Sequence, residues 1–267
     1  MSKFLSCWKI RIMAIVLLVT VMGGCMDIDV YAENVNASET AVTKQVAGQV
    51  NNSTDKLSGY VVLGDSRCCG LIVTLLDDKD AVCLYDFLES PRCDGVFLKD
   101  GKLLIICSES GGYYRSGAYN RTMERAIKLA NRYANEYNVS SYATANLFAF
   151  NDLFLDGESS AITAPSNYVR LDKELRYKIK NCSKVYQFNA GPVSETGSVY
   201  MNGGPSNALI ANYNSGFNGT DYVSVVDLYG YLMSVGYDAL DNDVDDTGIH
   251  YDHATNKKII DLIYTLQ

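Results

Sequence analysis

An apolar run that ends in Gly-Asp-Ser constrains this chain more than any other stretch. Residues 60–63 read Tyr-Val-Val-Leu, and Gly64-Asp65-Ser66 follows directly. A short run of Tyr, Val and Leu bounded by Gly predicts a buried strand. Residues 68–76 are mostly apolar and predict a helix that begins near Ser66. Ser66 is therefore expected just past the C-terminal end of a strand, where open α/β sheets place ligands and reactive groups.

The first 32 residues have the pattern of a secretory signal peptide. Basic residues precede an apolar run from about residue 12 to residue 22, and Val30-Tyr31-Ala32 offers small residues at cleavage spacing. This run is shorter than the roughly 20 residues that span a bilayer, so we expect no stable membrane span. We expect cleavage after Ala32 and a secreted or cell-surface protein. The alternative is a lipoprotein anchored at Cys25, which follows Met22-Gly23-Gly24.

The mature chain divides into a linker and one domain. Residues 33–57 are rich in Asn, Ser, Thr, Val and Gln without apolar periodicity, which predicts a disordered linker. Residues 58–267 are enough for a single domain with a sizeable core. The formal net charge of the whole chain is −8, which argues against nucleic acid or an anionic membrane surface as the partner. The sequence favours no oligomeric state.

Predicted strands and helices alternate along this domain. Lys99-Asp100-Gly101 joins two of the strands and predicts a hairpin with an Asp-Gly turn. The alternation predicts an α/β domain with a mostly parallel sheet covered on both faces. The predicted strands are 60–64, 81–85, 96–98, 102–107, 142–150, 184–188 and 222–226, and the predicted helices are 68–76, 120–137, 167–180, 206–214, 228–235 and 254–266.

The cysteines after the signal region are expected to be mainly buried free thiols. Export permits disulfides, but a domain of this size does not require them. The chain has no Cys-x-x-Cys pair and only 2 His, so we expect no metal site and no cofactor. The cysteines concerned are Cys68, Cys69, Cys83, Cys93, Cys107 and Cys182.

Polar residues that suit acyl transfer follow several of the predicted elements. Ser66 follows the first strand, Gly111-Gly112 follows a hairpin arm, Asn151 follows the strand predicted at 142–150, and His250 precedes the last helix. A Ser hydroxyl needs a base such as imidazole to take its proton. Backbone N–H groups in a Gly loop and an Asn amide suit the binding of a developing oxyanion. Parallel strands end at one edge of a sheet, so we expect these residues to converge.

The ordered blocks of this set resemble the SGNH (GDSL-type) hydrolase superfamily, in particular its secreted members from Gram-positive gut bacteria. The blocks are Gly64-Asp65-Ser66-Arg67, Gly112, Asn151-Asp152 and Gly248-Ile249-His250-Tyr251, and the resemblance covers nearly all of the chain from residue 58. It implies a flavodoxin-like, three-layer α/β/α fold with a mostly parallel, five-stranded sheet. It also implies a serine esterase, a carboxylic ester hydrolase, with Ser66 as nucleophile and His250 as base. The Ser66 N–H, the Gly112 N–H and the Asn151 amide would form the oxyanion hole.

Two positions depart from the pattern of that superfamily. Its members usually have Gly two residues before the Asn, where this chain has Ala149. Their acid lies three residues before the His, where this chain has Thr247. We therefore take Asp246 as the acid that orients the imidazole, with Asp245 or a backbone carbonyl as alternatives. Loss of an orienting carboxylate leaves the imidazole in the wrong tautomer and lowers turnover by orders of magnitude.

Each candidate residue also has a second interpretation. Ser66 suits a helix cap, and His253 is the rival base to His250. Arg67 either pairs structurally or contacts substrate. Tyr113 is a candidate for stacking on a sugar ring. Gly111 is an alternative donor to Gly112.

The predicted function is the removal of acyl groups, with short ones such as acetyl expected, from a glycan or small-molecule ester. Two alternatives use the same residues. One is a catalytically impaired module that binds cell-surface glycan, which Thr247 and Ala149 motivate. The other is acyl transfer to a glycan acceptor, a glycan O-acyltransferase.

Overall fold

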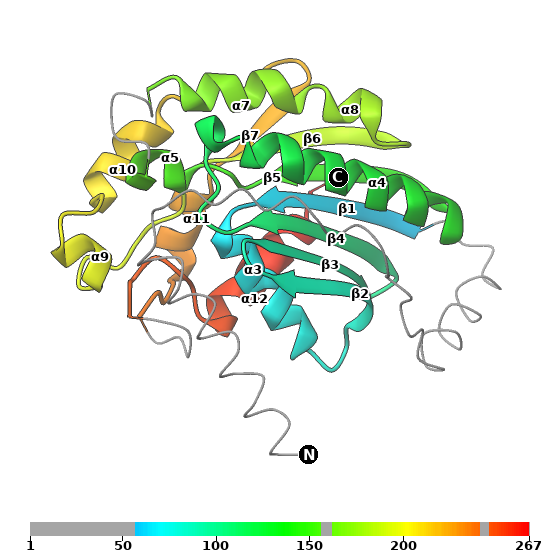
Figure 1. Cartoon of the computed structure of the whole chain (residues 1–267), viewed down its shortest axis with the longest axis horizontal. Helices are drawn as coiled ribbons and strands as arrows, with labels where there is room; N and C mark the ends of the chain where they lie inside the picture. Colours follow the sequence, from blue (N-terminus) through cyan, green and yellow to red (C-terminus); the bar gives the residue numbers. More distant parts are fainter. Residues whose placement is uncertain (1–56, 156–161, 241–245, 267) are drawn as a thin grey trace. The chain divides into compact units, whose positions relative to one another are not determined.

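A seven-stranded sheet in the order β2-β3-β4-β1-β5-β6-β7 forms the centre of the domain, with β1 (Leu57–Gly64) in its middle (Figure 1). The structure is a computed structural model, and it describes residues 57–155, 162–240 and 246–266. Residues Tyr60 to Leu63 of β1 are at most 1% exposed. This burial on both faces explains the continuous apolar run from which the strand was predicted.

Most of the sheet is parallel, as the sequence predicted, but it has seven strands rather than the predicted five. Five neighbouring strands, β4, β1, β5, β6 and β7, run parallel, while β3 is antiparallel to both β2 and β4. The number five came from the family resemblance, and it was wrong because the hairpin strands β2 and β3 extend the parallel set at one edge. The seven strands predicted from the residue patterns all occur. The strands after β1 are β2 (Val82–Glu89), β3 (Arg92–Lys99), β4 (Lys102–Glu109), β5 (Val139–Asn146), β6 (Cys182–Phe188) and β7 (Val223–Val226).

The predicted Asp-Gly turn joins β3 to β4. Asp100 has φ 51° and Gly101 has φ 67°. Positive φ at both central residues belongs to the hairpin turn whose twist matches that of the flanking strands, and Asp-Gly is among the sequences that adopt it most readily.

Helices cover both faces of the sheet (Figure 1). One face carries α4 (Ala118–Glu136), α7 (Ala164–Asp172) and α8 (Leu175–Lys178), and the other carries α3 (Ser66–Leu76) and α12 (His253–Tyr264). Helix α11 (Leu228–Val235) follows β7. The remaining short helices are η1 (Tyr114–Ser116), α5 (Phe150–Leu155), α9 (Ser198–Met201) and α10 (Asn207–Asn214).

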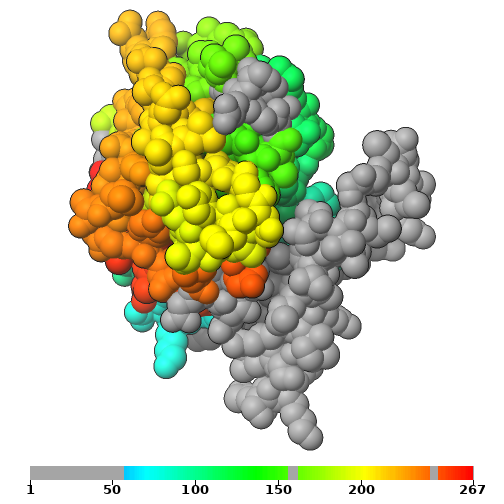
Figure 2. All heavy atoms as spheres, turned by 90° about the vertical axis from the view of Figure 1, so that its left-hand side faces the viewer, coloured from blue at the N-terminus to red at the C-terminus, as the bar shows by residue number. Residues whose placement is uncertain are grey.

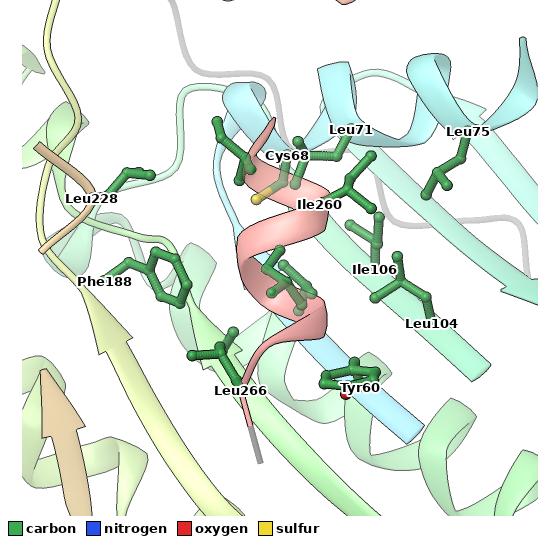
Figure 3. Packing of buried hydrophobic residues seen from close by; sticks show 14 of the residues in the cluster. Tyr60, Cys68, Leu71, Leu75, Leu104, Ile106, Phe188, Leu228, Ile260 and Leu266 are labelled. Atoms are coloured by element: carbon green, nitrogen blue, oxygen red, sulfur yellow. The ribbon is translucent and has the colours of Figure 1, made fainter. Parts of the chain in front are cut away.

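A buried apolar cluster joins α3 and α12 to the sheet (Figure 3). Leu71 and Leu75 of α3 pack with Ile260 of α12 and with Leu104 and Ile106 of β4. All five side chains are at most 2% exposed. Full burial of such side chains contributes about 1.5–3 kcal/mol each. The last helix of the chain is thereby fixed against the helix that begins at Ser66.

Two elements differ from those predicted. The strand predicted to run to residue 150 ends at Asn146, and Asn151 lies in α5. The Asn146 side chain accepts a hydrogen bond from the Phe148 N–H (2.9 Å), which turns the chain out of the sheet. An apolar run does not distinguish a strand from the buried helix that follows it. The predicted helix 167–180 is divided into α7 and α8.

The predicted signal peptide, residues 1–32, lies outside the described residues, as does the predicted linker except for Leu57. Both stay predictions. In residues 57–155, 162–240 and 246–266, no helix is long and apolar enough to cross a membrane.

Candidate functional site

Ser66 is the first residue of α3 and directly follows the turn at the end of β1. The Asp65 side chain caps the helix by accepting a hydrogen bond from the Arg67 N–H (3.0 Å). An Asp at this position satisfies an N–H group that the first helical turn leaves without a partner, so Asp65 rather than Ser66 is the cap. A Cβ atom on Gly64 would lie 2.1 Å from Cys68 Sγ, so a side chain at this position would displace the buried Cys68 thiol. Ser66 itself remains half-buried.

His250 contacts Ser66 although the two residues are 184 positions apart. His250 Nε2 lies 2.9 Å from Ser66 Oγ, which is hydrogen-bonding distance. His250 lies in the segment just before α12, and Gly248 in the same segment has φ 77°, a conformation that favours glycine. The structure thus brings together the two residues predicted as nucleophile and base.

His253, the rival base, lies elsewhere. It is the first residue of α12, and its Nε2 is 3.7 Å from the Asp77 carboxylate, with 54% of the His253 side chain exposed. The hydrogen bond to Ser66 therefore distinguishes His250 from His253.

Arg67, the residue after Ser66, binds the backbone of the segment that contains His250 (residues 247–250, the histidine segment). Its Nε donates to the Ile249 carbonyl (2.9 Å), and its Nη1 donates to the Gly191 carbonyl (3.0 Å). The guanidinium lies over the rings of Phe150 (4.1 Å) and Tyr251 (5.0 Å). Both kinds of contact favour the structural interpretation of Arg67.

The histidine segment is also bound along its backbone to the loop that follows β6. The Ser194 N–H donates to the Gly248 carbonyl (2.8 Å), and the Val199 N–H donates to the Thr247 carbonyl (3.1 Å). A Cβ atom on Gly197 would lie 2.4 Å from the Thr247 carbonyl oxygen, so the two loops pack backbone against backbone. Figure 2 faces this side of the molecule, where the yellow region around α9 and α10 lies beside the orange residues of the later loops.

The predicted acid, Asp246, is exposed and is bound to Ser198. Its Oδ1 lies 3.4 Å from Ser198 Oγ, and its carbonyl accepts a hydrogen bond from the Ser198 N–H (3.0 Å). The alternative acid, Asp245, lies outside the described residues. The role of Asp246 in orienting the imidazole stays a prediction.

Asp65 is the charged residue of the site that sequence reasoning treated only as part of a motif. It is 2% exposed, and within the described residues its Oδ2 has no hydrogen-bond partner. Burial raises the pKa of Asp65, while the charges of Arg67 and His250 oppose that rise. Its carboxylate is thus electrostatically coupled to the imidazole. The feature that marks Asp65 as a functional residue is a buried carboxylate oxygen next to Ser66 without a partner among the described residues. Only the three-dimensional structure shows this feature, so the sequence could not have revealed it.

Gly112 and Asn151, predicted for the oxyanion hole, lie in contact with each other. Asn151 is 4% exposed, and its Nδ2 donates to the Gly112 carbonyl (3.1 Å). The Gly112 N–H donates to the Glu109 carbonyl (3.0 Å). A Cβ atom on Gly112 would lie 2.8 Å from both the Ala118 Cβ and the Glu109 carbonyl oxygen, so this position requires glycine. Gly112 therefore uses its N–H within the loop, and the Asn151 amide keeps a second N–H.

The remaining predicted positions border this loop. Tyr113 is half-buried, and its N–H donates to Ser116 Oγ (3.1 Å) at the start of η1. Gly111 has φ 70° with nothing near its Cβ direction. Ala149, which replaces the expected glycine, is 1% exposed. In the described ranges, no group of three His, Cys, Asp or Glu residues is arranged to hold a metal ion.

Comparisons with known proteins do not return the superfamily that the sequence resembles. No protein-family model matches, and no curated protein matches significantly. A futalosine hydrolase mutant of Helicobacter pylori is among the similar solved structures, with 10% identity, a TM-score of 0.26, and coverage of 80% of this chain and 100% of the other. A 5'-methylthioadenosine/S-adenosyl homocysteine nucleosidase of Campylobacter jejuni has 11% identity, a TM-score of 0.21, and coverage of 68% and 80%. A Schistosoma mansoni purine nucleoside phosphorylase has 14% identity, a TM-score of 0.22, and coverage of 84% and 94%.

These findings correct the predicted family and function. The similar structures are enzymes of nucleosides rather than SGNH hydrolases, which contradicts the predicted family, the carboxylic esterase activity and the glycan or small-molecule ester partner. The glycan-binding and O-acyltransferase alternatives rest on the same resemblance and are withdrawn with it. At TM-scores of 0.21 to 0.27 the likeness assigns no nucleoside activity to this chain either.

Proposed function

We propose that Ser66 and His250 form the proton-transfer pair of an enzyme active site. The observation that carries this proposal is the 2.9 Å contact between Ser66 Oγ and His250 Nε2. A neutral imidazole in that position accepts the hydroxyl proton, and the serine oxygen then reacts more readily with an electrophilic centre. The pair is half-buried, so a substrate group has access to it.

The position of the pair in the sheet supports an active site. The parallel strands β4, β1, β5, β6 and β7 follow the flavodoxin-like order, and we propose that arrangement, in three layers, for the domain. In this order the chain after β1 goes to one side of β1, where β4 lies, and the chain after β4 crosses to the other side, where β5 lies. Ligands bind beyond the carboxyl ends of the strands at such a reversal. Ser66 follows the end of β1 there, and Asn151 lies in α5, just beyond the end of β5.

Three further roles complete the proposal. Asp65 stabilises positive charge on His250 through the field of its buried carboxylate. The second N–H of Asn151 and the Ser66 N–H bind negative charge that develops on the substrate, with Gly112 holding the Asn151 amide in place. Asp246 stays the proposed orienting acid.

The test is substrate-independent labelling with a fluorophosphonate, which transfers its phosphonyl group to an activated hydroxyl and releases fluoride. We expect one label per chain, located at Ser66 by peptide mapping, and a labelling rate at least 100-fold lower in His250→Ala, within the range that general-base catalysis contributes. Ser66→Ala is expected to remain unlabelled.

Ser166→Ala is the matched control, because Ser166 is an exposed serine on α7 whose hydroxyl donates to the Thr163 carbonyl (3.0 Å) at the start of that helix. It is expected to label like the wild type. An unlabelled wild type, or equal labelling of the wild type and Ser66→Ala, would overturn the proposal.

A further inference from the structure

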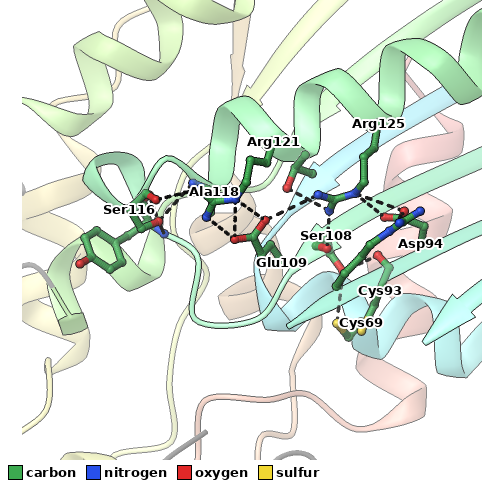
Figure 4. A network of polar contacts seen from close by, with 12 residues as sticks. Cys69, Cys93, Asp94, Ser108, Glu109, Ser116, Ala118, Arg121 and Arg125 are labelled. Carbon is green, nitrogen blue, oxygen red and sulfur yellow. Dashed lines mark hydrogen bonds and ion pairs between the residues drawn. The ribbon is translucent and has the colours of Figure 1, made fainter. Parts of the chain in front are cut away.

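Cys69 and Cys93 meet beside the first turn of α3. Cys69 Sγ lies 3.2 Å from Ser108 Oγ, and that hydroxyl donates to the Cys93 carbonyl (2.9 Å). The sheet register pairs Cys93 on β3 with Ser108 on β4. Figure 4 shows the two cysteine side chains together next to Ser108. A helix residue and a strand residue thus direct their sulfur atoms toward the same place.

The Cys69 and Cys93 side chains interact with each other. This contact is the largest cause that lowers the pKa of Cys69 and raises the pKa of Cys93, so Cys69 ionises first. Both residues are half-buried, whereas Cys68 and Cys107 are buried and burial raises the pKa of each. Thiolate character and access decide which thiols exchange with disulfides. Thiolate character therefore favours Cys69 as the attacking thiol, and access favours both Cys69 and Cys93 over Cys68 and Cys107.

We propose that Cys69 and Cys93 are a disulfide site, which closes when the protein meets a small disulfide oxidant such as oxidised glutathione. The Cys69 thiolate attacks one sulfur of the oxidant, forms a mixed disulfide and releases one glutathione thiolate. The Cys93 thiolate then attacks Cys69 Sγ and releases the second glutathione. Two protein thiols lose their protons and two electrons, and the oxidant takes up both as two glutathione thiols.

The bridge joins two elements that are otherwise held by packing. It fixes the first turn of α3 to β3 and closes the chain between residues 69 and 93. Closing a loop of that length restricts the unfolded chain, and the expected rise in Tm is roughly 5–10 °C. The rise is expected only where an oxidant is present.

The experiment exposes the reduced full chain to glutathione buffers of increasing oxidised fraction, blocks remaining thiols with N-ethylmaleimide, and maps peptides by fragmentation mass spectrometry. We expect one disulfide between Cys69 and Cys93, a mass loss of two hydrogen atoms, and alkylation of the other four described cysteines. Alkylation of both Cys69 and Cys93, separate glutathione adducts on them, or a bridge to a different cysteine would overturn the proposal.

Two variants separate this bridge from general oxidation. Cys93→Ser is expected to form no internal disulfide and to show no oxidant-dependent rise in Tm. Cys83→Ser is the matched control, because Cys83 is also half-buried on the hairpin but pairs with Phe97 in the register. It is expected to behave like the wild type. An equal rise in Tm in Cys93→Ser would exclude the assignment.

Discussion

Arg67 donates a hydrogen bond to the carbonyl of Ile249 (2.9 Å), so the residue after the serine fixes the residue before the histidine. This hydrogen bond therefore connects the serine and histidine segments in addition to the contact between Ser66 and His250. Because the guanidinium also binds the Gly191 carbonyl and lies over Phe150, one side chain anchors three segments at the site.

Loss of this anchor should loosen the imidazole without removing it. We expect Arg67→Lys to lower the rate of fluorophosphonate labelling at Ser66 by at least tenfold, since a lysine ammonium does not reproduce the planar set of donors. The labelling rate and the Tm are the measurements. Arg132→Lys is the control, because Arg132 forms an exposed pair with Glu136 and exposed pairs contribute about 0–1 kcal/mol. A wild-type labelling rate in Arg67→Lys would contradict the anchoring role.

Asp172 should make stability depend on pH. It is fully buried, and burial raises its pKa to about 7, although hydrogen bonds from Tyr119 and Asn146 oppose the rise. Between about pH 4 and pH 7 the native state therefore holds a proton that the unfolded state has lost, so the free energy of unfolding falls as the pH rises through this window. The total change is of the order of 4 kcal/mol at about 1.4 kcal/mol per pKa unit.

Asp172→Asn removes this titration, so its free energy of unfolding should vary less between pH 4 and pH 7 than that of the wild type. Urea unfolding at several pH values measures the difference. Parallel pH profiles of the wild type and the variant would show that Asp172 does not titrate in this range.

Gly112→Ala should destabilise the domain more than Gly111→Ala. An added methyl at Gly112 meets Ala118 and the Glu109 carbonyl at 2.8 Å, and overpacking of this kind typically costs about 1–3 kcal/mol. At Gly111 an added methyl meets no other atom. The substitution there destabilises the protein only because a residue with a side chain is strained at φ 70°, which costs about 1 kcal/mol. Thermal unfolding of both variants checks the order, and a larger loss in Gly111→Ala would contradict it.

Arg125→Ala should be strongly destabilising because it removes a partner from a buried carboxylate. Asp94 is fully buried and is bound by Arg125 Nε (3.2 Å) and Arg92 Nε (2.6 Å), as Figure 4 shows for the Arg125 side. Breaking a buried pair on one side costs about 3–5 kcal/mol. The free energy of unfolding is the measurement. Arg132→Ala, with its exposed partner, is expected to lose less than 1 kcal/mol.

Sequence reasoning predicted the elements whose signals are local. The Asp100-Gly101 hairpin, the strand before Ser66 and the last helix all occur where the turn chemistry and periodicity indicated them. The end of β5 was predicted too late because the Asn146 side chain accepts a hydrogen bond from the Phe148 N–H, where the chain turns out of the sheet. The apolar run in the sequence does not indicate this hydrogen bond. The pairing of Ser66 with His250 was predicted from chemistry, whereas the anchoring contacts of Arg67 depend on backbone carbonyls and leave no residue pattern. The family resemblance led to a function that the comparisons contradict.

The packing of α12 on α3 also determines when the Ser66–His250 contact can form during synthesis of the chain. The serine is synthesised 184 positions before the histidine, and the apolar contacts that bring them together include Ile260, beyond the histidine itself. A nascent chain thus carries a serine without its base until α12 has left the ribosome. Premature termination at any point before α12 yields a chain without the pair.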